Sequence, residues 1–401
     1  MVSLADIRAA EERIAPHIIH TLLVYSPTIS AMTGASVYLK LETLQKAGSF
    51  KVRGATNKIL VHQDECRKHG VIAASAGNHA QGVAVAAHAA GVPATIVMPE
   101  WASLSKQEAT REYGAGVLIE GLTLEESITK AGQMARNGPL FIHPYDDEEV
   151  IAGQGTIGLE ILADLPGTDM IIVPVGGGGL IAGIATAAKA LRPDITIIGA
   201  QAAACPSAYE ALRHVGPFQV TAGRTIADGI RVTQTGTVTL PIIRELVSGI
   251  ELASEEEIAE AMLLLLERKH VIAEGAGAVP LAVLLNGSIP VKKGSTIVLV
   301  ISGGNVDSPQ LFRIIRQALM RQGRILHLTV HMDNRPGTLA RLISLITQLK
   351  GNITNVQHNQ NECGAGSQMI RVEIEIETRG KEHAAEIRKA LTEKGYELME
   401  W

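Results

Sequence analysis

The chain has 401 residues, of which 46% are hydrophobic and 19% are charged. This length suggests two or three domains at roughly 100 to 200 residues per domain, and the composition excludes extended disorder. The 36 basic and 41 acidic side chains give a formal net charge of −5, which argues against a nucleic-acid-binding protein.

The N-terminal segment predicts an amphipathic helix rather than an export signal, because acidic residues interrupt its apolar positions. An uncharged run at 170–188 is long enough to cross a membrane, but Pro174 and four consecutive glycines would break such a helix, so we expect no membrane association. The cysteines Cys66, Cys205 and Cys363 are too widely separated for a disulfide framework or a zinc motif. They favour a reducing, cytoplasmic location.

Short apolar runs alternate with longer alanine-rich helical patterns from about residue 35 to 305. The runs lie at 94–98, 116–121, 170–175, 195–200 and 296–302. This alternation is typical of parallel strands that are buried on both faces in an α/β fold. Ligands in such folds bind at the carboxyl ends of the strands, so we expect the chemistry where a strand ends in glycine or serine.

The pattern changes after the arginine-rich segment 313–324, where we place a domain boundary. We expect a first domain over 1–318 with a small subdomain at about 40–145 inserted in it, a linker at 319–324 and a second domain over 325–401. The second domain has the order strand, helix, two strands, helix and a short final strand at its end. This order predicts a ferredoxin-like βαββαβ module.

The segment 47–55, AGSFKVRGA, contains a candidate catalytic lysine. Ser49 predicts a helix N-cap, which would place Lys51 in the first turn, where the positive end of the helix dipole lowers the pKa of an amine. Such a lysine suits imine chemistry with a carbonyl compound. An arbitrary lysine is more often a solvated surface residue, and the flanking serine, phenylalanine and glycine favour the catalytic interpretation here.

Two further segments predict anion sites at helix starts. In 71–82 an apolar run ends in Ser75-Ala76-Gly77-Asn78-His79 before a long helix, whose free N–H groups could bind a carboxylate or phosphate; an ordinary strand-to-helix turn is equally compatible. In 173–183 the glycines precede a helix and point several N–H groups at one place, which indicates a phosphate. The glycines and the residue that follows them are Gly176, Gly177, Gly178, Gly179 and Leu180.

The glycine-rich segment also matches a dinucleotide-binding fingerprint, so an NAD-dependent oxidoreductase has to be considered. That alternative needs an acidic residue at the end of the next strand, and Gln201 stands there instead. The strand pattern at 297–305 ends in Ser302, Gly303, Gly304 and Asn305; Ser302 could face a ligand or cap a helix. The sequence has no G-x-S-x-G, H-E-x-x-H or Walker motif.

An imine-forming lysine, a phosphate loop, a carboxylate-binding helix start and a polar strand end together describe a pyridoxal phosphate site. The motifs GSFKVRGA, SAGNHAQG, GGGGL, TIADGI and SGGN, in this order, closely resemble those of the fold-type II pyridoxal phosphate enzymes, above all the threonine dehydratases, also called threonine ammonia-lyases. The resemblance covers about residues 5–315 and implies two open twisted parallel sheets flanked by helices. The C-terminal motifs DNRPGTLARLI and GNITNV resemble an ACT domain.

The resemblance implies a role for each matched residue. Lys51 would form the imine with pyridoxal 5'-phosphate and then remove the substrate's α proton. Asn78 would bond the cofactor's 3' oxygen, and Ser302 its pyridine nitrogen. The other implied cofactor positions are Phe50, Gly176 to Gly179, Leu180, Gly229 and Glu274, and the substrate carboxylate would lie at Ser75, Ala76, Gly77, Asn78 and His79.

The implied reaction is dehydration and deamination of L-threonine to 2-oxobutanoate and ammonia, with L-serine giving pyruvate. A serine hydroxyl cannot hold the pyridine nitrogen protonated, which favours loss of a β leaving group over transamination. An ammonia-lyase for L-serine or 3-hydroxyaspartate on the same scaffold is the alternative. A non-catalytic amino-acid sensor is disfavoured because every cofactor motif is intact.

Related serine racemases have a serine where this chain has Ala76, so we expect weak racemisation. They also hold a divalent metal through acidic residues that the segment 201–208 lacks, so we expect no metal. ACT domains commonly pair and bind an amino acid between them, which implies a homodimer or homotetramer and an effector, isoleucine or valine. The implied contacts are Asn334, Gly337, Asn352 and Ile353; a domain that only assembles subunits is the alternative.

Overall fold

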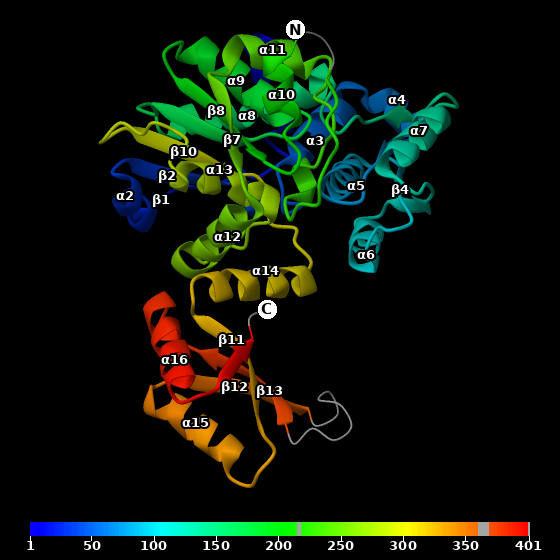
Figure 1. Ribbon diagram of the computed structural model, residues 1–401. Helices are drawn as coiled ribbons and strands as arrows, with labels where there is room; N and C mark the ends of the chain where they lie inside the picture. Colours follow the sequence, from blue (N-terminus) through cyan, green and yellow to red (C-terminus); the bar gives the residue numbers. More distant parts are fainter. Residues whose placement is uncertain (215–217, 360–368, 400–401) are drawn as a thin grey trace. The chain divides into compact units, whose positions relative to one another are not determined.

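A computed structural model describes residues 1–214, 218–359 and 369–399 of the chain (Figure 1). Cys363 lies outside the described residues, as do parts of two strands predicted in the second domain, at 367–378 and 397–401. The chain divides into two compact units, Met1–Asp307 and Ser308–Trp401.

The first unit contains a six-stranded sheet with the strand order β1-β2-β10-β7-β8-β9, in which only the pairing of β1 with β2 is antiparallel. The strands are β1 (Leu23–Tyr25), β2 (Ser36–Leu41), β7 (Met170–Pro174), β8 (Thr196–Ala202), β9 (Gly249–Ala253) and β10 (Thr296–Ile301). The central strands β7 and β10 are buried along nearly their whole length, as their continuous apolar runs predict.

Helices cover both faces of this sheet, with α9 and α11 on one side and α12 and α13 on the other (Figure 1). The helices of this part of the unit are α1 (Leu4–Ile14), α2 (Pro27–Thr33), α8 (Glu148–Asp164), α9 (Gly179–Leu191), α10 (Ser207–Arg213), α11 (Thr239–Leu246), α12 (Glu255–Lys269) and α13 (Gly275–Leu285), with short 3-10 turns η1 (Glu42–Leu44) and η2 (Asp228–Ile230).

A smaller, wholly parallel sheet with the order β5-β4-β3-β6 lies within the predicted small subdomain. Its strands are β3 (Val71–Ala74), β4 (Ala94–Met98), β5 (Gly116–Ile119) and β6 (Leu140–Phe141). The helices of this part are α3 (Lys51–Val61), α4 (Gln63–His69), α5 (Asn78–Ala90), α6 (Leu104–Glu112) and α7 (Leu124–Ala135). Helix α3 packs against both α5 and α8 and so connects the two sheets.

The carboxyl ends of three strands lead directly into the predicted motifs. Strand β3 ends before Ser75, β7 ends before the glycine loop, and β10 ends before Ser302. The α/β fold and its two open sheets are therefore confirmed, with the antiparallel edge strand β1 as an addition.

The second unit begins with α14 (Ser308–Arg321) and continues with an antiparallel sheet of order β12-β13-β11-β14. Its remaining elements are β11 (Ile325–Asp333), α15 (Thr338–Gln348), β12 (Asn352–Asn359), β13 (Met369–Glu377), α16 (Lys381–Glu393) and β14 (Glu397–Met399). This order confirms the ferredoxin-like module. Buried and half-buried residues alternate along β13, as expected for a sheet with one face on a core.

The boundary expected at residue 318 falls inside α14, which belongs to the second unit. An ion pair explains this placement, because Arg316 of α14 bonds the carboxylate of Glu375 on β13. The Thr378 hydroxyl also donates to the carbonyl of Gly323. No helix in the described part of the chain is long and apolar enough to cross a membrane, and the run at 170–188 forms β7 and most of α9.

Candidate active site

Lys51 is the first residue of α3, and its amine is buried in the first unit. Its Nζ donates to the carbonyl oxygen of Pro144 at 2.7 Å and lies 5.2 Å from the centre of the Phe50 ring. Burial lowers the pKa of Lys51 to about 8, although Glu274 acts in the opposite direction. A large share of this amine is therefore neutral near pH 8, as a nucleophile or base requires.

The predicted N-cap for α3 is wrong. Phe50 occupies the N-cap position, and α3 has no side-chain cap. The Ser49 backbone pairs with that of Gly303, and its buried hydroxyl has no hydrogen-bond partner among the described residues. The predicted position of Lys51 is nevertheless confirmed, because Lys51 lies in the first turn of α3.

The segment that follows β3 forms the start of α5, with Gly77 at the N-cap and Asn78 as the first helical residue. The Ser75 hydroxyl accepts from the Gly77 N–H at 3.1 Å, so it shapes the turn. Buried His79 contacts the Ile142 carbonyl at 2.8 Å through Nε2, and burial lowers the pKa of its imidazole to about 3. His79 is therefore neutral and structural, which leaves the backbone N–H groups as anion donors.

The half-buried Asn78 and the buried Glu274 form a polar pair across the two halves of the unit. Asn78 Nδ2 donates to Glu274 Oε1 at 2.6 Å. Burial and the nearby Asp228 raise the pKa of the Glu274 carboxyl to about 8. Gly229 lies beside the pair, since a Cβ built there would be 3.4 Å from Glu274 Oε1. The structure thus brings together three residues that are up to 196 positions apart.

The glycine loop packs so closely against its neighbours that side chains would not fit. A Cβ on Gly177 would lie 2.3 Å from the Tyr145 ring, and one on Gly179 would lie 2.8 Å from the Tyr145 carbonyl oxygen. Gly178 has a φ of +98°, which favours glycine. Helix α9 begins at Gly179, so its first N–H groups are available to an anion, as predicted.

The remaining predicted cofactor positions are also near these groups. Ser302 is 2% exposed, and its carbonyl accepts from the Phe50 N–H at 3.1 Å, directly before Lys51. Gly176 lies against Ile230, next to Gly229. Leu180 is buried in the core of the larger sheet.

Asn305 is the last residue of the SGGN motif, and the sequence alone predicts no role for it. Its Nδ2 lies 2.9 Å from Asn78 Oδ1, 3.1 Å from Gln81 Oε1 and 2.7 Å from the Ala47 carbonyl oxygen. It therefore fixes the orientation of the Asn78 amide, whose Nδ2 is left to donate. An asparagine at the end of a strand motif is the signal that could have revealed it.

The segment 143–146 was also missed. Pro144 accepts the bond from Lys51, and Tyr145 packs against the glycine loop. Asp146 accepts from the backbone N–H groups of Thr237 and Val238, both at 2.8 Å, at the start of α11. The preceding strand β6 has only two residues, too few for a recognisable pattern.

The dinucleotide alternative is disfavoured by the role of Gln201. Its Oε1 accepts from the N–H groups of Ala208 and Tyr209 at 3.1 Å, and its Nε2 donates to the Val175 carbonyl. It closes a turn and is not free to hold a ribose. Among the described residues no group of three or more acidic, histidine or cysteine side chains could hold a metal ion.

The candidate effector residues are not brought together within one chain. Asn334 and Gly337 follow the end of β11, whose last residue Asp333 pairs with Met369. Asn352 and Ile353 begin β12 at the other end of the sheet, where Asn352 pairs with Glu377. Eight residue steps of β11 separate the two ends, about 27 Å at ~3.4 Å per residue.

The residues of the first unit fit pyridoxal phosphate. A buried amine with a lowered pKa suits its aldehyde, and a loop without room for side chains at a helix start suits its phosphate. Two further polar groups, the Asn78 amide and the Ser302 hydroxyl, could hold polar atoms of its ring.

Comparison with known proteins bears this out. Residues 14–303 match the family model of the pyridoxal-phosphate dependent enzymes, and residues 327–392 match the ACT domain model. The chain is 45% identical to a protein named L-threonine ammonia-lyase from Thermotoga maritima, over 99% of both chains, and 46% identical to one of the same name from Geobacter sulfurreducens, over 97% of both. This chain belongs to the threonine ammonia-lyase family of pyridoxal-phosphate dependent enzymes.

This threonine ammonia-lyase family member is a carbon–nitrogen lyase with pyridoxal phosphate as its cofactor, which confirms the family, cofactor and ACT domain predicted from the motifs. Its fold is shared by a threonine deaminase from T.th., with a TM-score of 0.72 and 42% identity over 76% of this chain and 99% of that one. A maize serine racemase has a TM-score of 0.75 and 35% identity over 80% of this chain and 99% of that one.

Proposed function

We propose that this protein converts L-threonine to 2-oxobutanoate and ammonia, with a side activity that converts L-serine to pyruvate. Two relatives that match over nearly their whole length are named L-threonine ammonia-lyase. The observation that carries the proposal is the buried Lys51 amine, which faces the site and has a pKa lowered to about 8. When bound, pyridoxal phosphate supplies the electron sink that acidifies the substrate's α carbon.

The protein's own groups divide the remaining tasks. Lys51 Nζ takes the α proton, because burial keeps a large share of it neutral. The backbone N–H groups at the start of α5 hold the substrate carboxylate, with the neutral His79 packed behind them. Ser302, at the end of β10, would hold the pyridine nitrogen with a neutral hydroxyl, and this would favour loss of the β hydroxyl.

Racemisation is expected to be a minor side reaction. It would need an acid on the face opposite Lys51, and at the position that matches the racemase motif the half-buried Ala76 has only a methyl group. We also expect activity without a divalent metal.

We propose that isoleucine or valine regulates the enzyme at a site formed by two ACT domains. The separation of Asn334 and Gly337 from Asn352 and Ile353 along one sheet supports a pair, because only a second copy can bring one set to the other. Regulation requires that the effector binds two states with different affinities. A homodimer or homotetramer satisfies this geometry. We retain the cytoplasm as the proposed location, where Cys66 and Cys205 would stay free thiols.

The test is the initial rate of 2-oxo acid release by the purified holoenzyme over a concentration series of L-threonine, with and without L-isoleucine. We expect release from L-threonine, a higher KM or a sigmoidal curve with isoleucine, and slower release from L-serine. Rate curves that coincide with and without isoleucine or valine, together with no binding of either amino acid in calorimetry, would overturn the proposed regulation. Preference for L-serine or 3-hydroxyaspartate over L-threonine would overturn the substrate.

A further inference from the structure

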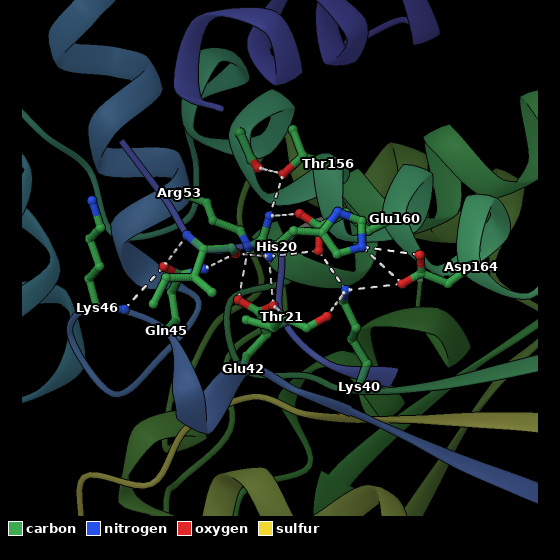
Figure 2. A network of polar contacts seen from close by, with 12 residues as sticks. His20, Thr21, Lys40, Glu42, Gln45, Lys46, Arg53, Thr156, Glu160 and Asp164 are labelled. Atoms are coloured by element: carbon green, nitrogen blue, oxygen red, sulfur yellow. Dashed lines mark hydrogen bonds and ion pairs between the residues drawn. The ribbon is translucent and has the colours of Figure 1, made fainter. Parts of the chain in front are cut away.

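A network of buried charges surrounds Arg53 of α3, the helix that begins with Lys51 (Figure 2). Lys51 and Arg53 are both in the first turn of α3, but two residues correspond to roughly 200° around a helix, so their side chains leave it on opposite sides. Lys51 reaches the Pro144 carbonyl, and Arg53 reaches η1 and α8.

Arg53 is fully buried and holds a carboxylate on each side of its guanidinium. Its Nε and Nη2 donate to the two oxygens of Glu42, both at 2.8 Å. Its Nη1 and Nη2 donate to the two oxygens of Glu160, and Nη1 also donates to the Thr156 hydroxyl at 3.1 Å. Two such bidentate pairs fix both the position and the plane of the guanidinium.

Two further residues close the network into a ring. Lys40 pairs with Glu160 and donates to the Thr21 carbonyl at 2.8 Å, while the Thr21 hydroxyl donates to Glu42 Oε1 at 2.6 Å. We call Thr21, Lys40, Glu42, Arg53 and Glu160 the Arg53 ring. Its two cations and two carboxylates balance, and Figure 2 shows that His20 and Asp164 join it at its outer edge.

The pKa values of Arg53 and Glu160 are both shifted toward the charged form. Burial tends to lower the pKa of Arg53, but the two carboxylates outweigh this and raise it. Burial tends to raise the pKa of Glu160, but Arg53 and Lys40 outweigh this and lower it. A closed set of buried charges tolerates little displacement, because an unpaired ion in this environment is costly.

The backbone of the same turn is also held from two sides. A Cβ on Gly82 of α5 would lie 3.0 Å from the Lys51 backbone carbon, and one on Gly153 of α8 would lie 2.7 Å from the Arg53 carbonyl oxygen. The close approach limits sideways movement of the turn, and the two bidentate pairs limit its sliding and rotation. The backbone at Lys51 is therefore held in one position.

We propose that the Arg53 ring consists of positioning residues for the reaction, which hold the first turn of α3 so that the Lys51 amine meets the cofactor and the substrate in one place. The inference rests on the proposed role of Lys51 as the reacting amine. It does not depend on which amino acid is the substrate.

The test compares Arg53→Lys with Lys58→Met as a matched control. Arg53→Lys keeps the positive charge but loses the guanidinium group that makes the two bidentate pairs. Lys58 is in the same helix, seven residues after Lys51, and pairs with Asp147 and Glu149 next to and within α8. A milder variant, Thr156→Val, removes one hydrogen bond to Arg53 and keeps all four charges. For each holoenzyme we would measure kcat and KM for L-threonine, the thermal midpoint, and the rate at which absorbance of the bound cofactor returns when pyridoxal phosphate is added to cofactor-free protein.

We expect Arg53→Lys to lower both kcat and the rate of cofactor attachment about tenfold or more, with little change in KM, because small misplacements of a reacting group are costly. Thr156→Val should lower both by a few-fold, and Lys58→Met should lower only the thermal midpoint. If Arg53→Lys does not fold, the comparison of Thr156→Val with Lys58→Met decides in the same way.

Ring variants that lose thermal stability but keep kcat and the attachment rate within twofold of the wild type would overturn the proposal. The attachment rate needs no substrate. Slow attachment in Arg53→Lys together with no release from L-threonine by the wild type would therefore support the ring and reject the substrate.

Discussion

The two candidate sites of this protein are assembled in different ways. In the first unit, residues from several distant segments meet around Lys51, and each makes at least one close contact with another part of the site. In the second unit, the candidate effector residues lie at two ends of one sheet, and Asn334, Gly337 and Asn352 are exposed. One chain thus brings the candidate catalytic residues together, whereas the proposed effector site would need a second chain.

This difference predicts how the two sites respond to change. In a site whose residues contact one another, almost any substitution is expected to reduce function, because each residue has several partners. An exposed half-site can change without affecting catalysis, since surface substitutions cost little stability. The following predictions test that contrast, beginning with the largest expected effect.

Lys51→Ala should abolish the reaction, with a loss of about a thousandfold or more, because it removes the amine that bonds the cofactor and moves the proton. The wild type reduced with borohydride should carry the cofactor's mass on the peptide that contains Lys51. Lys46→Ala, a nearby lysine outside the site, serves as the control and should keep both activity and labelling. Labelling of another peptide in the wild type would contradict the assignment.

Gly177→Ala should weaken pyridoxal phosphate binding about tenfold or more, because its Cβ would lie 2.3 Å from the Tyr145 ring and overpacking costs roughly 1 to 3 kcal/mol. The measurement is the equilibrium dissociation of the cofactor, followed by absorbance. Gly249→Ala is the matched control, since a Cβ there meets nothing within 4 Å. Equal cofactor affinities for the two variants would show that the loop has room for side chains.

Glu274→Gln should change how the stability of the cofactor-free protein depends on pH. The pKa of Glu274 is raised from 4.5 to about 8 by burial and Asp228, so the folded state keeps a proton that the unfolded chain has lost. The free energy of unfolding therefore falls as pH rises from about 4.5 to about 8, and glutamine removes this loss.

Thermal unfolding measured across that pH range should show a growing advantage of the Glu274→Gln variant. Lys51 acts in a separate window, because its pKa is lowered from 10.5 to about 8, and its contribution raises stability as pH rises from about 8 to 10.5. Parallel curves for the wild type and the variant below pH 8 would mean that Glu274 is ionised in the folded state.

Asn352→Ala should have the smallest effect on catalysis. Its Nδ2 donates to Glu377 at 2.9 Å on the surface of the second unit. We expect kcat without effector to stay within about twofold, while the isoleucine concentration for half-maximal effect shifts about fivefold or more. The exposed Lys389→Ala variant should change neither value. Sedimentation should show at least a dimer, and an isoleucine response in a monomeric protein would contradict the two-chain site.

The strands and the anion loops could be predicted from the sequence because their signals are local. Continuous apolar runs located β4, β7 and β10 to within one or two residues, and four adjacent glycines located the start of α9. The family resemblance then implied that Asn78, Glu274 and Ser302 contact the cofactor. Each of these residues belongs to a short motif.

The parts that were missed depend on contacts between distant segments. Ser49 resembles an N-cap, but its backbone pairs with that of Gly303, and its hydroxyl has no hydrogen-bond partner within the described part of the chain. Asn305, the Pro144 carbonyl and the Arg53 ring act on residues tens to hundreds of positions away. No spacing along the chain predicts which carboxylates a buried arginine will bind.

The most direct test of the central claim is 2-oxo acid release from L-threonine by purified holoenzyme, compared with L-serine at equal concentration. We predict 2-oxobutanoate and ammonia in equal amounts, at a higher kcat/KM than for pyruvate from L-serine. Bound pyridoxal phosphate without release from L-threonine would contradict the claim, and the chain would then be a lyase for another β-hydroxy amino acid.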